Sequence, residues 1–388
     1  MKILEFMDMN PTKYGGLERF MFRLMKTRSK DNFFFVFQNS PQSEELVRDF
    51  TACGAEIIVL DTEGKKAIKK LFQVFKLFLK IKPDLVHFHF ANGFFLFAPL
   101  AKLAGVKYLV KTQHCCLTTN DLKQIQNKSQ FSLKTKILSI NGKIYRLFDR
   151  IVFCGKYVQQ QFESVYGKSS KNKMIYLGVE PINILTVDKQ VVLKKQLNIS
   201  DDCKVITTVL FADPIKGADV LIKAISFIKR DDFIVCIVGV NDNLECAKNL
   251  HRLARNLNVE DKIRWIGITD YVNKYLSISD IYCQPSRSEA LGLAVCEAKS
   301  AKLPIIGSDI CGLPEVSNIL FQSENSEELG EKLACLLEDK QLRQELSLQS
   351  YQDFCDNFDI SIGVEKYSQL YDELTLSKPV GGINLAHT

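Results

Sequence analysis

Several features are missing from this sequence, and their absence excludes some classes of protein. It has no run of roughly 20 apolar residues, the length that a membrane-spanning helix needs, and its longest apolar stretch, "FFLFAPLAKLAGV", contains Lys102. Its twelve cysteines include no C-x-x-C pair, the spacing typical of zinc and redox sites. Met1 and Lys2 lead directly into an apolar segment, without the pattern of a secretory leader. We therefore expect a cytoplasmic protein with free thiols and no membrane-spanning segment.

The charges are unevenly divided between the two halves of the chain. Residues 1–180 carry a net charge of +14, whereas residues 181–388 carry −8. The basic half has no interleaved aromatic and basic motif of the kind that binds nucleic acid, so no nucleic-acid partner is expected. The two halves are predicted to meet different partners.

Short β-rich runs alternate with longer helical patterns along the chain, which predicts an α/β protein with doubly wound parallel sheets. A chain of 388 residues is too long for one ordinary core. We expect one Rossmann-like domain over residues 1–180 and a second over 181–358, facing each other across a cleft. A helix over 359–375 is expected to cross back to the first domain, and a tail over 376–388 to be disordered. Ligands of such sheets bind at the carboxyl ends of the strands.

The predicted helix over residues 65–81 is rich in lysine. At 100° per residue its lysines fall within a sector of about 140°, and apolar residues fill the other side. These lysines are Lys65, Lys66, Lys69, Lys70, Lys76 and Lys80. The pattern is typical of a surface helix with a solvated face, but it also fits a face directed at an anionic membrane surface. A second basic stretch, residues 122–147, contains six lysines and arginines and no acid.

Two glutamates, Glu289 and Glu297, lie eight residues apart in "PSRSEALGLAVCEAKSAKLPIIG", which reads as a strand end, a glycine turn and a helix. Free N–H groups at such a helix start, around Gly292, favour an anion such as phosphate. A carboxylate beside a phosphate is unfavourable unless it binds hydroxyl groups, and a buried one needs a partner. The combination indicates a nucleotide-sugar site.

These residues carry a resemblance to a known family. "EALGLAVCEA" followed by "KLPIIGSDICGLPEV" resembles the E-x7-E signature of retaining glycosyltransferase family 4, whose fold is GT-B. The resemblance extends over nearly the whole chain, through "YGGLE" (14–18), "DLVHFHF" (84–90), "KTQH" (111–114), "IYLGVE" (175–180) and "IKGADVLIKAI" (215–225).

The resemblance implies roles for residues of the second domain. Glu297 is expected to hold the ribose of the donor, and Glu289 the hydroxyls of the transferred sugar. Lys216 is expected to neutralise the leaving diphosphate, where negative charge builds up as the glycosidic bond breaks. The backbone against the diphosphate is that of Ala290, Leu291, Gly292 and Leu293. The sequence contains no D-x-D metal motif, so no metal or other cofactor is expected.

In the first domain, the resemblance places Gly15 and Gly16 where their lack of side chains lets the backbone approach the donor or acceptor phosphate. His114 matches a family histidine near the reacting sugar. The sequence also departs from the family pattern. Many members have an arginine five residues before the loop lysine, where Phe211 stands here, or directly before it, where Ile215 stands here. The diphosphate is then held by Lys216 alone or together with another basic residue.

Each assignment has a structural alternative. Glu297 could pair with Lys299, Lys216 could be an ordinary loop lysine, and the two glycines could form only a turn. His87 and His89 alternate on one strand and, with His114, could suggest zinc. No acidic or thiolate cluster completes such a site, so these histidines are read as cleft or core residues.

The sequence thus predicts a retaining, metal-independent glycosyltransferase of cell-surface polysaccharide synthesis, with a UDP-sugar as the expected donor. The acceptor is expected to be a glycan or a polyisoprenoid-linked precursor, because a basic domain suits an anionic membrane and an acceptor pyrophosphate. Two alternatives stay open: a non-catalytic GT-B subunit that supports a partner transferase, and a sugar-nucleotide epimerase.

Overall fold

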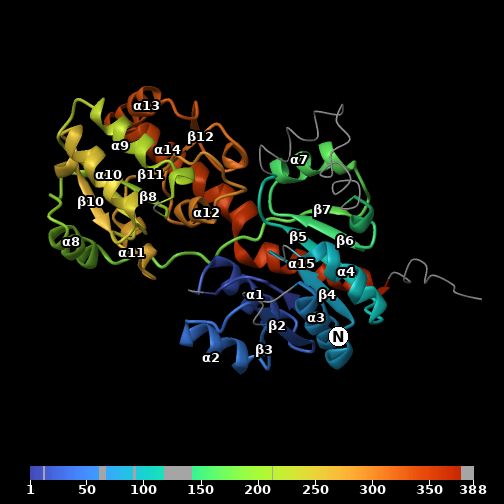
Figure 1. Cartoon of the computed structure of the whole chain (residues 1–388). Helices are drawn as coiled ribbons and strands as arrows, with labels where there is room; N and C mark the ends of the chain where they lie inside the picture. Colours follow the sequence, from blue (N-terminus) through green and yellow to red (C-terminus); the bar gives the residue numbers. More distant parts are fainter. Residues whose placement is uncertain (12–13, 61–66, 91–92, 118–141, 212, 377–388) are drawn as a thin grey trace, which may run out of the picture. The chain divides into compact units, whose positions relative to one another are not determined.

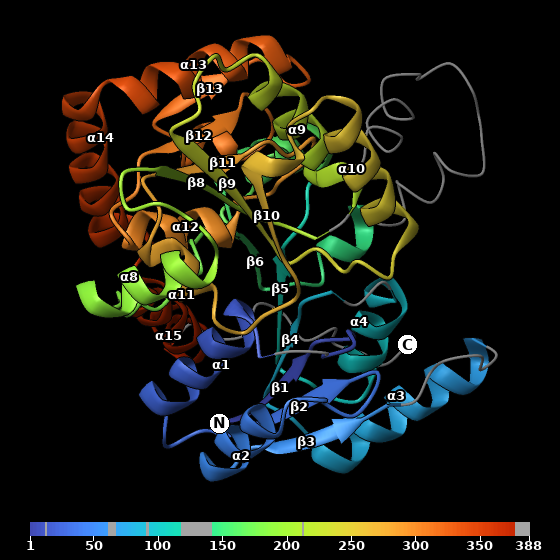
Figure 2. The ribbon, with the colours of Figure 1, turned by 90° about the vertical axis from the view of Figure 1, so that its left-hand side faces the viewer.

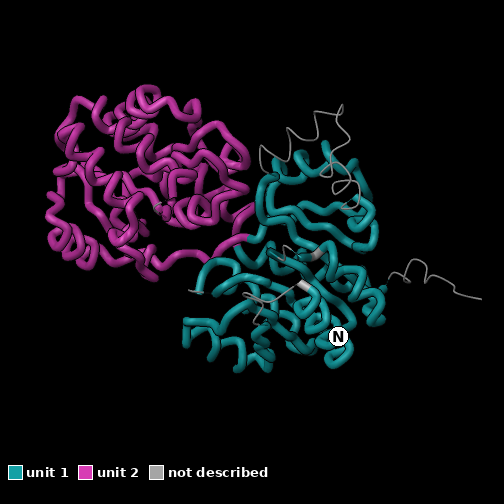
Figure 3. The backbone as a smooth tube through the Cα atoms, viewed as in Figure 1, with its two compact units in different colours: residues 1–177, 360–388 teal, residues 178–359 magenta. Residues whose placement is uncertain are grey.

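The computed structural model describes residues 1–11, 14–60, 67–90, 93–117, 142–211 and 213–376. Contacts within the chain divide it into two compact units (Figure 3). Unit 1 comprises Met1–Leu177 and the segment that starts at Ile360, and unit 2 comprises Gly178–Asp359. The C-terminal helix therefore belongs with the N-terminal sheet.

Unit 1 is built on a seven-stranded parallel sheet with the order β3-β2-β1-β4-β5-β6-β7 (Figure 1). Its first six strands lie on β-rich runs of the sequence, whereas β7 overlaps the predicted run "KMIYL" only at Lys173 and Met174. The strands are β1 (Lys2–Phe6), β2 (Asn32–Phe37), β3 (Glu56–Val59), β4 (Leu85–Phe88), β5 (Tyr108–Gln113), β6 (Arg150–Phe153) and β7 (Asn172–Met174). Its central strands β1 and β4 are almost wholly buried, as expected for a sheet covered on both faces.

Helices cover both faces of this sheet (Figure 2). Helix α1 packs against α15, and α3 packs against α4. The Arg28 guanidinium after α1 donates to the Ser368 carbonyl and to the Asp372 carboxylate of α15, both at 2.9 Å, which ties the C-terminal helix to the first one. The helices are α1 (Gly16–Thr27), α2 (Glu44–Ala52), α3 (Ala67–Ile81), α4 (Phe94–Leu103), α7 (Lys156–Tyr166) and α15 (Ile360–Leu376).

Unit 2 has a six-stranded parallel sheet with the order β10-β9-β8-β11-β12-β13. Its strands are β8 (Lys204–Val209), β9 (Phe233–Val238), β10 (Ile263–Ile266), β11 (Ile281–Gln284), β12 (Ile305–Ser308) and β13 (Ile319–Phe321). The edge strand β13 was not predicted, because its three residues are too few to show an alternating pattern. Its helices are α8 (Val187–Gln196), α9 (Ala218–Ser226), α10 (Glu245–Asn256), α11 (Val272–Ser277), α12 (Leu293–Ser300), α13 (Ser326–Glu338) and α14 (Lys340–Asp353).

Both sheets reverse their strand order at one point. In unit 1 the chain runs outward from β1 to β2 and β3 and then returns to β4 on the other side of β1. In unit 2 it runs from β8 to β9 and β10 and returns to β11 on the other side of β8. Loops at such a switch point diverge and leave room for a ligand at the carboxyl ends of the strands. Lys216, Glu289 and Gly292 lie in the loops after β8 and β11, and Leu293 and Glu297 lie on the helix α12 that follows.

Candidate functional site

Two loops of unit 2 meet beyond the carboxyl ends of β8 and β11, which are neighbours in the sheet. The first loop contains the short 3-10 helix Pro214–Lys216, which the Asp213 carboxylate caps by accepting from the Ile215 N–H at 2.8 Å. Gly217 follows with φ of +69°, and a Cβ there would lie 1.9 Å from the Pro285 carbonyl oxygen of the second loop. Only glycine permits this close approach.

The approach of the loops brings Lys216 and Glu289 together. The Lys216 Nζ donates to Glu289 Oε2 at 2.7 Å, and both side chains are partly shielded from solvent. The sequence predicted both residues as members of one site, and the structure places them in direct contact. Glu289 therefore has a protein partner in the form described here, and a bound diphosphate would share the same ammonium.

Helix α12 begins directly after this pair. Its N-cap residue, Gly292, has φ of +88°, a left-handed conformation that L side chains rarely adopt. Among the described residues, no hydrogen bond takes up the N–H groups of Leu291, Gly292 and Leu293. A hydrogen bond from the Gly312 N–H to the Glu289 carbonyl, at 2.9 Å, stabilises the loop that precedes α12. A helix start with free N–H groups is suited to bind an anion.

Glu297 lies on helix α12, in the second turn after Gly292. Its carboxylate and that of Glu289 are close enough to the fully buried Tyr282 of β11 to affect its hydroxyl: burial is the main cause that raises the pKa of Tyr282, and the charges of Glu297 and Glu289 raise it further. The ammonium of Lys299, the alternative partner of Glu297, instead pairs with Asp353 at 2.6 Å. Both glutamates thus lie near Tyr282 of strand β11.

Arg287 is a residue of this site that the sequence analysis missed. Its guanidinium donates to both carboxylate oxygens of Asp219, at 2.8 and 2.9 Å, to the Glu324 carboxylate and to the Pro214 carbonyl. Burial raises the pKa of Asp219, but the hydrogen bonds and the charge of Arg287 outweigh this effect and hold it below its ordinary value. Arg287 therefore links the loop after β11, which contains Glu289, to the loop after β8, which contains Lys216, and to the start of α9. Its only signal in the sequence is its place between Pro285 and Glu289.

Unit 1 carries a second cluster, at the ends of its central strands β1, β4 and β5. His89 Nε2 lies 2.8 Å from Glu5 Oε2, and His89 Nδ1 lies 2.9 Å from Nε2 of the predicted site residue His114. The His114 ring is partly exposed and stacks on Phe90, with their centroids 4.5 Å apart. His87 lies between the Tyr371 and Thr112 hydroxyls, at 2.6 and 2.8 Å.

The ionisation of this cluster is shifted by burial. Burial raises the pKa of Glu5 to about 8, although a hydrogen bond from Tyr371 opposes the effect. Burial also lowers the pKa of His89 to about 3 and that of Lys111 to about 8, and it lowers the pKa of His87 and His114 well below the usual range. The cluster is therefore expected to be electrically neutral at its core near pH 7.

Among the described residues, Glu5, His87 and His89 are the group that could offer converging ligand atoms to a metal, within 4.8 Å of one another. Their ligand atoms are already engaged in hydrogen bonds, to each other, to Tyr371 and to Thr112. These side chains thus form a hydrogen-bonded network. That the protein needs no metal for its activity stays a prediction.

The predicted glycines open helix α1. Gly15 is its N-cap residue, and its N–H donates to the Glu18 carboxylate at 3.0 Å. The Gly15 amide is therefore engaged within its own helix, whereas Gly16 is the first helical residue. The role of both glycines toward a phosphate stays a prediction.

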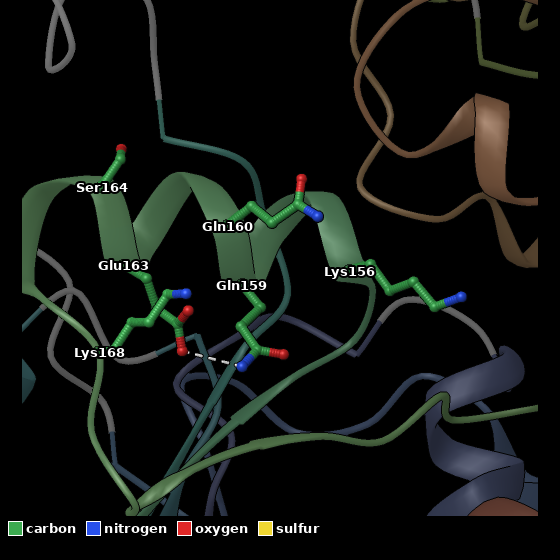
Figure 4. A pocket seen from close by; sticks show the side chains of 6 residues that line it. All are labelled: Lys156, Gln159, Gln160, Glu163, Ser164 and Lys168. Carbon is green, nitrogen blue, oxygen red and sulfur yellow. Dashed lines mark hydrogen bonds between the residues drawn. The ribbon is translucent and has the colours of Figure 1, made fainter.

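A separate pocket of about 500 Å³ lies on helix α7 of unit 1 (Figure 4). Polar side chains line it, and Glu163 accepts a hydrogen bond from Gln159 at 2.9 Å within it. The lining residues are Lys156, Gln159, Gln160, Glu163, Ser164 and Lys168. None of the predicted site residues is among them.

The comparisons with known proteins agree with this geometry. The family model "Glycosyl transferases group 1" matches residues 190–353, and "Glycosyltransferase Family 4" matches residues 14–182. The structure of Anabaena HepE in complex with UDP and glucose superimposes with a TM-score of 0.80 and 18% identity, covering 96% of this chain and 100% of that one. The two doubly wound sheets thus define a GT-B fold. The chain belongs to glycosyltransferase family 4.

Curated relatives match only part of this chain. The Escherichia coli O-antigen biosynthesis glycosyltransferase WclY is 26% identical over 234 residues, which is 60% of this chain and 63% of the relative. The Campylobacter jejuni N,N'-diacetylbacillosaminyl-diphospho-undecaprenol alpha-1,3-N-acetylgalactosaminyltransferase is 28% identical over 192 residues, 48% of this chain and 49% of that protein. The matched region therefore spans less than two thirds of each of these relatives.

Proposed function

We propose that this protein transfers a sugar from a nucleotide-diphosphate sugar to a hydroxyl group of a glycan or lipid-linked acceptor. The observation that carries the proposal is the contact of Lys216 with Glu289 beside the free N–H groups of Leu291, Gly292 and Leu293. A cation and a helix start suit a diphosphate, and a carboxylate next to them suits sugar hydroxyls. The expected donor is a UDP-sugar, and HepE, which shares the fold, binds UDP.

The proposed reaction retains the anomeric configuration. The bond from the anomeric carbon to the phosphate oxygen breaks, a bond to the acceptor oxygen forms on the same face, and the departing phosphate oxygen takes the proton of the acceptor. Lys216 and the start of α12 would stabilise the charge that develops on the diphosphate. Glu289 would hold the transferred sugar, Glu297 the ribose, and His114 would contact the sugar. No metal is required for these steps.

Product analysis tests this function. Purified protein is incubated with single UDP- and GDP-sugars and a membrane lipid extract, with and without EDTA, and the products are identified by mass spectrometry. We expect a glycosylated lipid or glycan and one released nucleotide diphosphate per sugar, unaffected by EDTA. An altered sugar nucleotide without an acceptor product would indicate an epimerase. No turnover without a partner protein would indicate a supporting subunit.

We also propose that helix α3 docks on an anionic membrane surface. Lys69, Lys76 and Lys80 are exposed, as the membrane interpretation requires. Of the apolar residues predicted opposite the lysines, Val74, Phe78 and Ile81 are buried, whereas Ile68, Phe72 and Leu79 are exposed at 80%, 58% and 46%. Lys70 is turned to Asp8 at 3.5 Å, and Lys65 and Lys66 lie outside the described residues.

This mixed face combines charge attraction with apolar insertion, which suits the headgroup region of a bilayer. Along the described helices, none is long and apolar enough to cross a membrane. The name of the Campylobacter relative contains N,N'-diacetylbacillosaminyl-diphospho-undecaprenol, a lipid-linked sugar, and a lipid-linked acceptor would also bring the protein to a membrane.

A vesicle assay tests the docking of α3. Replacing Phe72 and Leu79 by serine is expected to reduce co-flotation with vesicles containing about 30% phosphatidylglycerol by roughly 10-fold, since apolar burial contributes about 25 cal/mol per Å². The matched control is Leu348→Ser, an exposed leucine on α14 of unit 2, at 70% exposure. Equal flotation of both proteins would exclude this face as the docking surface.

A further inference from the structure

The buried cluster of unit 1 forms a hydrogen-bonded chain from the centre of the sheet to a partly exposed histidine. Glu5 Oε2 is 2.8 Å from His89 Nε2, and His89 Nδ1 is 2.9 Å from His114 Nε2. Among the described residues, His114 Nδ1 has no hydrogen-bond partner. A neutral imidazole ring donates from one nitrogen and accepts at the other. In such a series of hydrogen bonds, the role of one ring nitrogen therefore fixes the role of the other, and so the direction of the next hydrogen bond.

We propose that Glu5, acting through His89 as a positioning residue, fixes His114 in the tautomer that presents an Nδ1–H donor to an oxygen of the substrate. This inference rests on the proposed function, which places His114 at the sugar. It assigns roles to two residues that neither the sequence motifs nor the family resemblance singled out as functional.

The proton inventory allows two states of the chain. If the Glu5 carboxyl carries a proton on Oε2, it donates to His89 Nε2, His89 Nδ1–H donates to His114 Nε2, and His114 Nδ1 bears a hydrogen. If Glu5 is ionised, it accepts from His89 Nε2–H, His89 Nδ1 accepts from His114 Nε2–H, and His114 Nδ1 is a bare acceptor. The protonation of Glu5 therefore decides whether His114 Nδ1 is a hydrogen-bond donor or an acceptor.

The surroundings of Glu5 favour the protonated state. Its side chain is fully buried, and among the described residues no lysine or arginine forms an ion pair with it. An unpaired buried carboxylate is strongly disfavoured, so burial raises the pKa of Glu5 to about 8 and the protonated form predominates near pH 7. The Tyr371 hydroxyl donates to Glu5 Oε1 at 3.0 Å, which leaves Oε2 free to carry the proton.

The rest of the network is compatible with this state. With its own proton directed to Glu5, the Tyr371 hydroxyl accepts from His87 Nδ1–H, and His87 Nε2 accepts from Thr112. The Thr112 oxygen then accepts from Tyr367 of the same C-terminal helix, at 2.9 Å. Every partner in this set has a role that its chemistry permits. Among the described residues, further ionisable groups near the cluster include Lys111 on β5, Arg28 over the Tyr371 ring and the Cys154 thiol, which donates to the His114 carbonyl at 3.7 Å.

Glutamine at position 5 separates the two states. The Glu5→Gln amide can donate to His89 and accept from Tyr371, as the neutral acid does, but it cannot ionise. Glu5→Met removes both functions at similar size. Lys111 also titrates near pH 8 and is unchanged in both variants, so a difference between wild type and Glu5→Gln belongs to Glu5.

The test is the tautomer of His114, read from nitrogen-15 NMR of the histidine-labelled full chain. The chain has five histidines, and His114→Gln assigns the signal. We expect the Nδ1–H tautomer in wild type at neutral pH, its reversal as pH rises from about 7 to about 10, and no reversal in Glu5→Gln. The kcat for transfer should follow the same pattern, and Glu5→Met should lower kcat about 10- to 100-fold, the effect of one lost oriented hydrogen bond.

An Nε2–H tautomer of His114 in neutral wild type, or a reversal that persists in Glu5→Gln, would overturn the proposal. If Glu5→Met does not fold, the wild-type and glutamine titrations still decide. The tautomer is measured without turnover, so its outcome is independent of whether the protein transfers sugar. If the expected tautomers are found but no sugar is transferred, the proposed function is refuted. The direction of the hydrogen bonds from Glu5 through His89 to His114 would still be established.

Discussion

Replacing Lys216 with alanine is expected to lower kcat for sugar transfer by about 100- to 1000-fold, the range found when a preorganised group that stabilises transition-state charge is removed. The ammonium lies 2.7 Å from Glu289 and directly before Gly217, whose close approach to Pro285 fixes the loop. Binding of free UDP or GDP, measured by calorimetry, should weaken as well, because the same charge meets the diphosphate.

A matched control excludes a general effect of removing a lysine from unit 2. Lys248 on α10 forms a comparable pair with Glu245 at 3.6 Å, but both side chains are largely exposed and lie outside the candidate site. Lys248→Ala should leave kcat and nucleotide binding unchanged. Lys216→Arg keeps the charge but replaces a compact ammonium by a planar fork, and we expect it to restore only part of the activity. Full activity of Lys216→Ala would contradict the assignment.

The second large effect is expected for Glu289→Gln, and its pattern should differ from that of Lys216→Ala. The carboxylate is proposed to accept hydrogen bonds from sugar hydroxyls, and losing the charged acceptor should lower kcat/KM by about 10- to 100-fold. Binding of the free nucleotide diphosphate should be retained or become tighter, because Lys216 no longer has a carboxylate as its partner. Kinetics and calorimetry on the same preparations measure both quantities.

The control for this variant is Glu245→Gln on α10, which is expected to be silent. Weaker binding of nucleotide diphosphate in Glu289→Gln would mean that Glu289 acts mainly by holding Lys216 in place. An equal decrease of kcat/KM in Glu289→Gln and Glu245→Gln would indicate a general change in unit 2. The kinetics would then give no support for a contact between Glu289 and the sugar.

Most strands could be recognised from the sequence because the central ones are buried on both faces and show as mainly apolar runs, whereas the three-residue edge strand β13 could not. Strand β9, "FIVCIV", is buried along its whole length, and the loops that follow β8 and β11 could be recognised from Gly217 and Gly292. The strand order then requires these loops to be neighbours, which brings Lys216 near Glu289. The 2.7 Å contact itself depends on side-chain conformation and was not predicted.

Other parts of the sites could not be read in the same way. Arg287 acts through a bidentate contact to Asp219, 68 positions away, and no local pattern reports such a pair. The sequence does contain a sign of Glu5: it is a lone acid between Leu4 and Phe6 in a strand whose other buried residues are apolar. The argument that a buried carboxylate needs partners applied to it as it did to Glu289. Tyr367 and Tyr371, spaced by four on α15, would have suggested those partners only if the helix were known to cover the first sheet.

The most direct test of the central claim is a crystal structure of the chain with a nucleotide-diphosphate sugar that it turns over, or with the corresponding nucleotide diphosphate. The account predicts the diphosphate within hydrogen-bond distance of the Leu291, Gly292 and Leu293 N–H groups and of Lys216 Nζ, with Glu289 on the sugar hydroxyls and Glu297 on the ribose. A diphosphate bound away from the start of α12, with the Lys216–Glu289 contact unchanged, would contradict it.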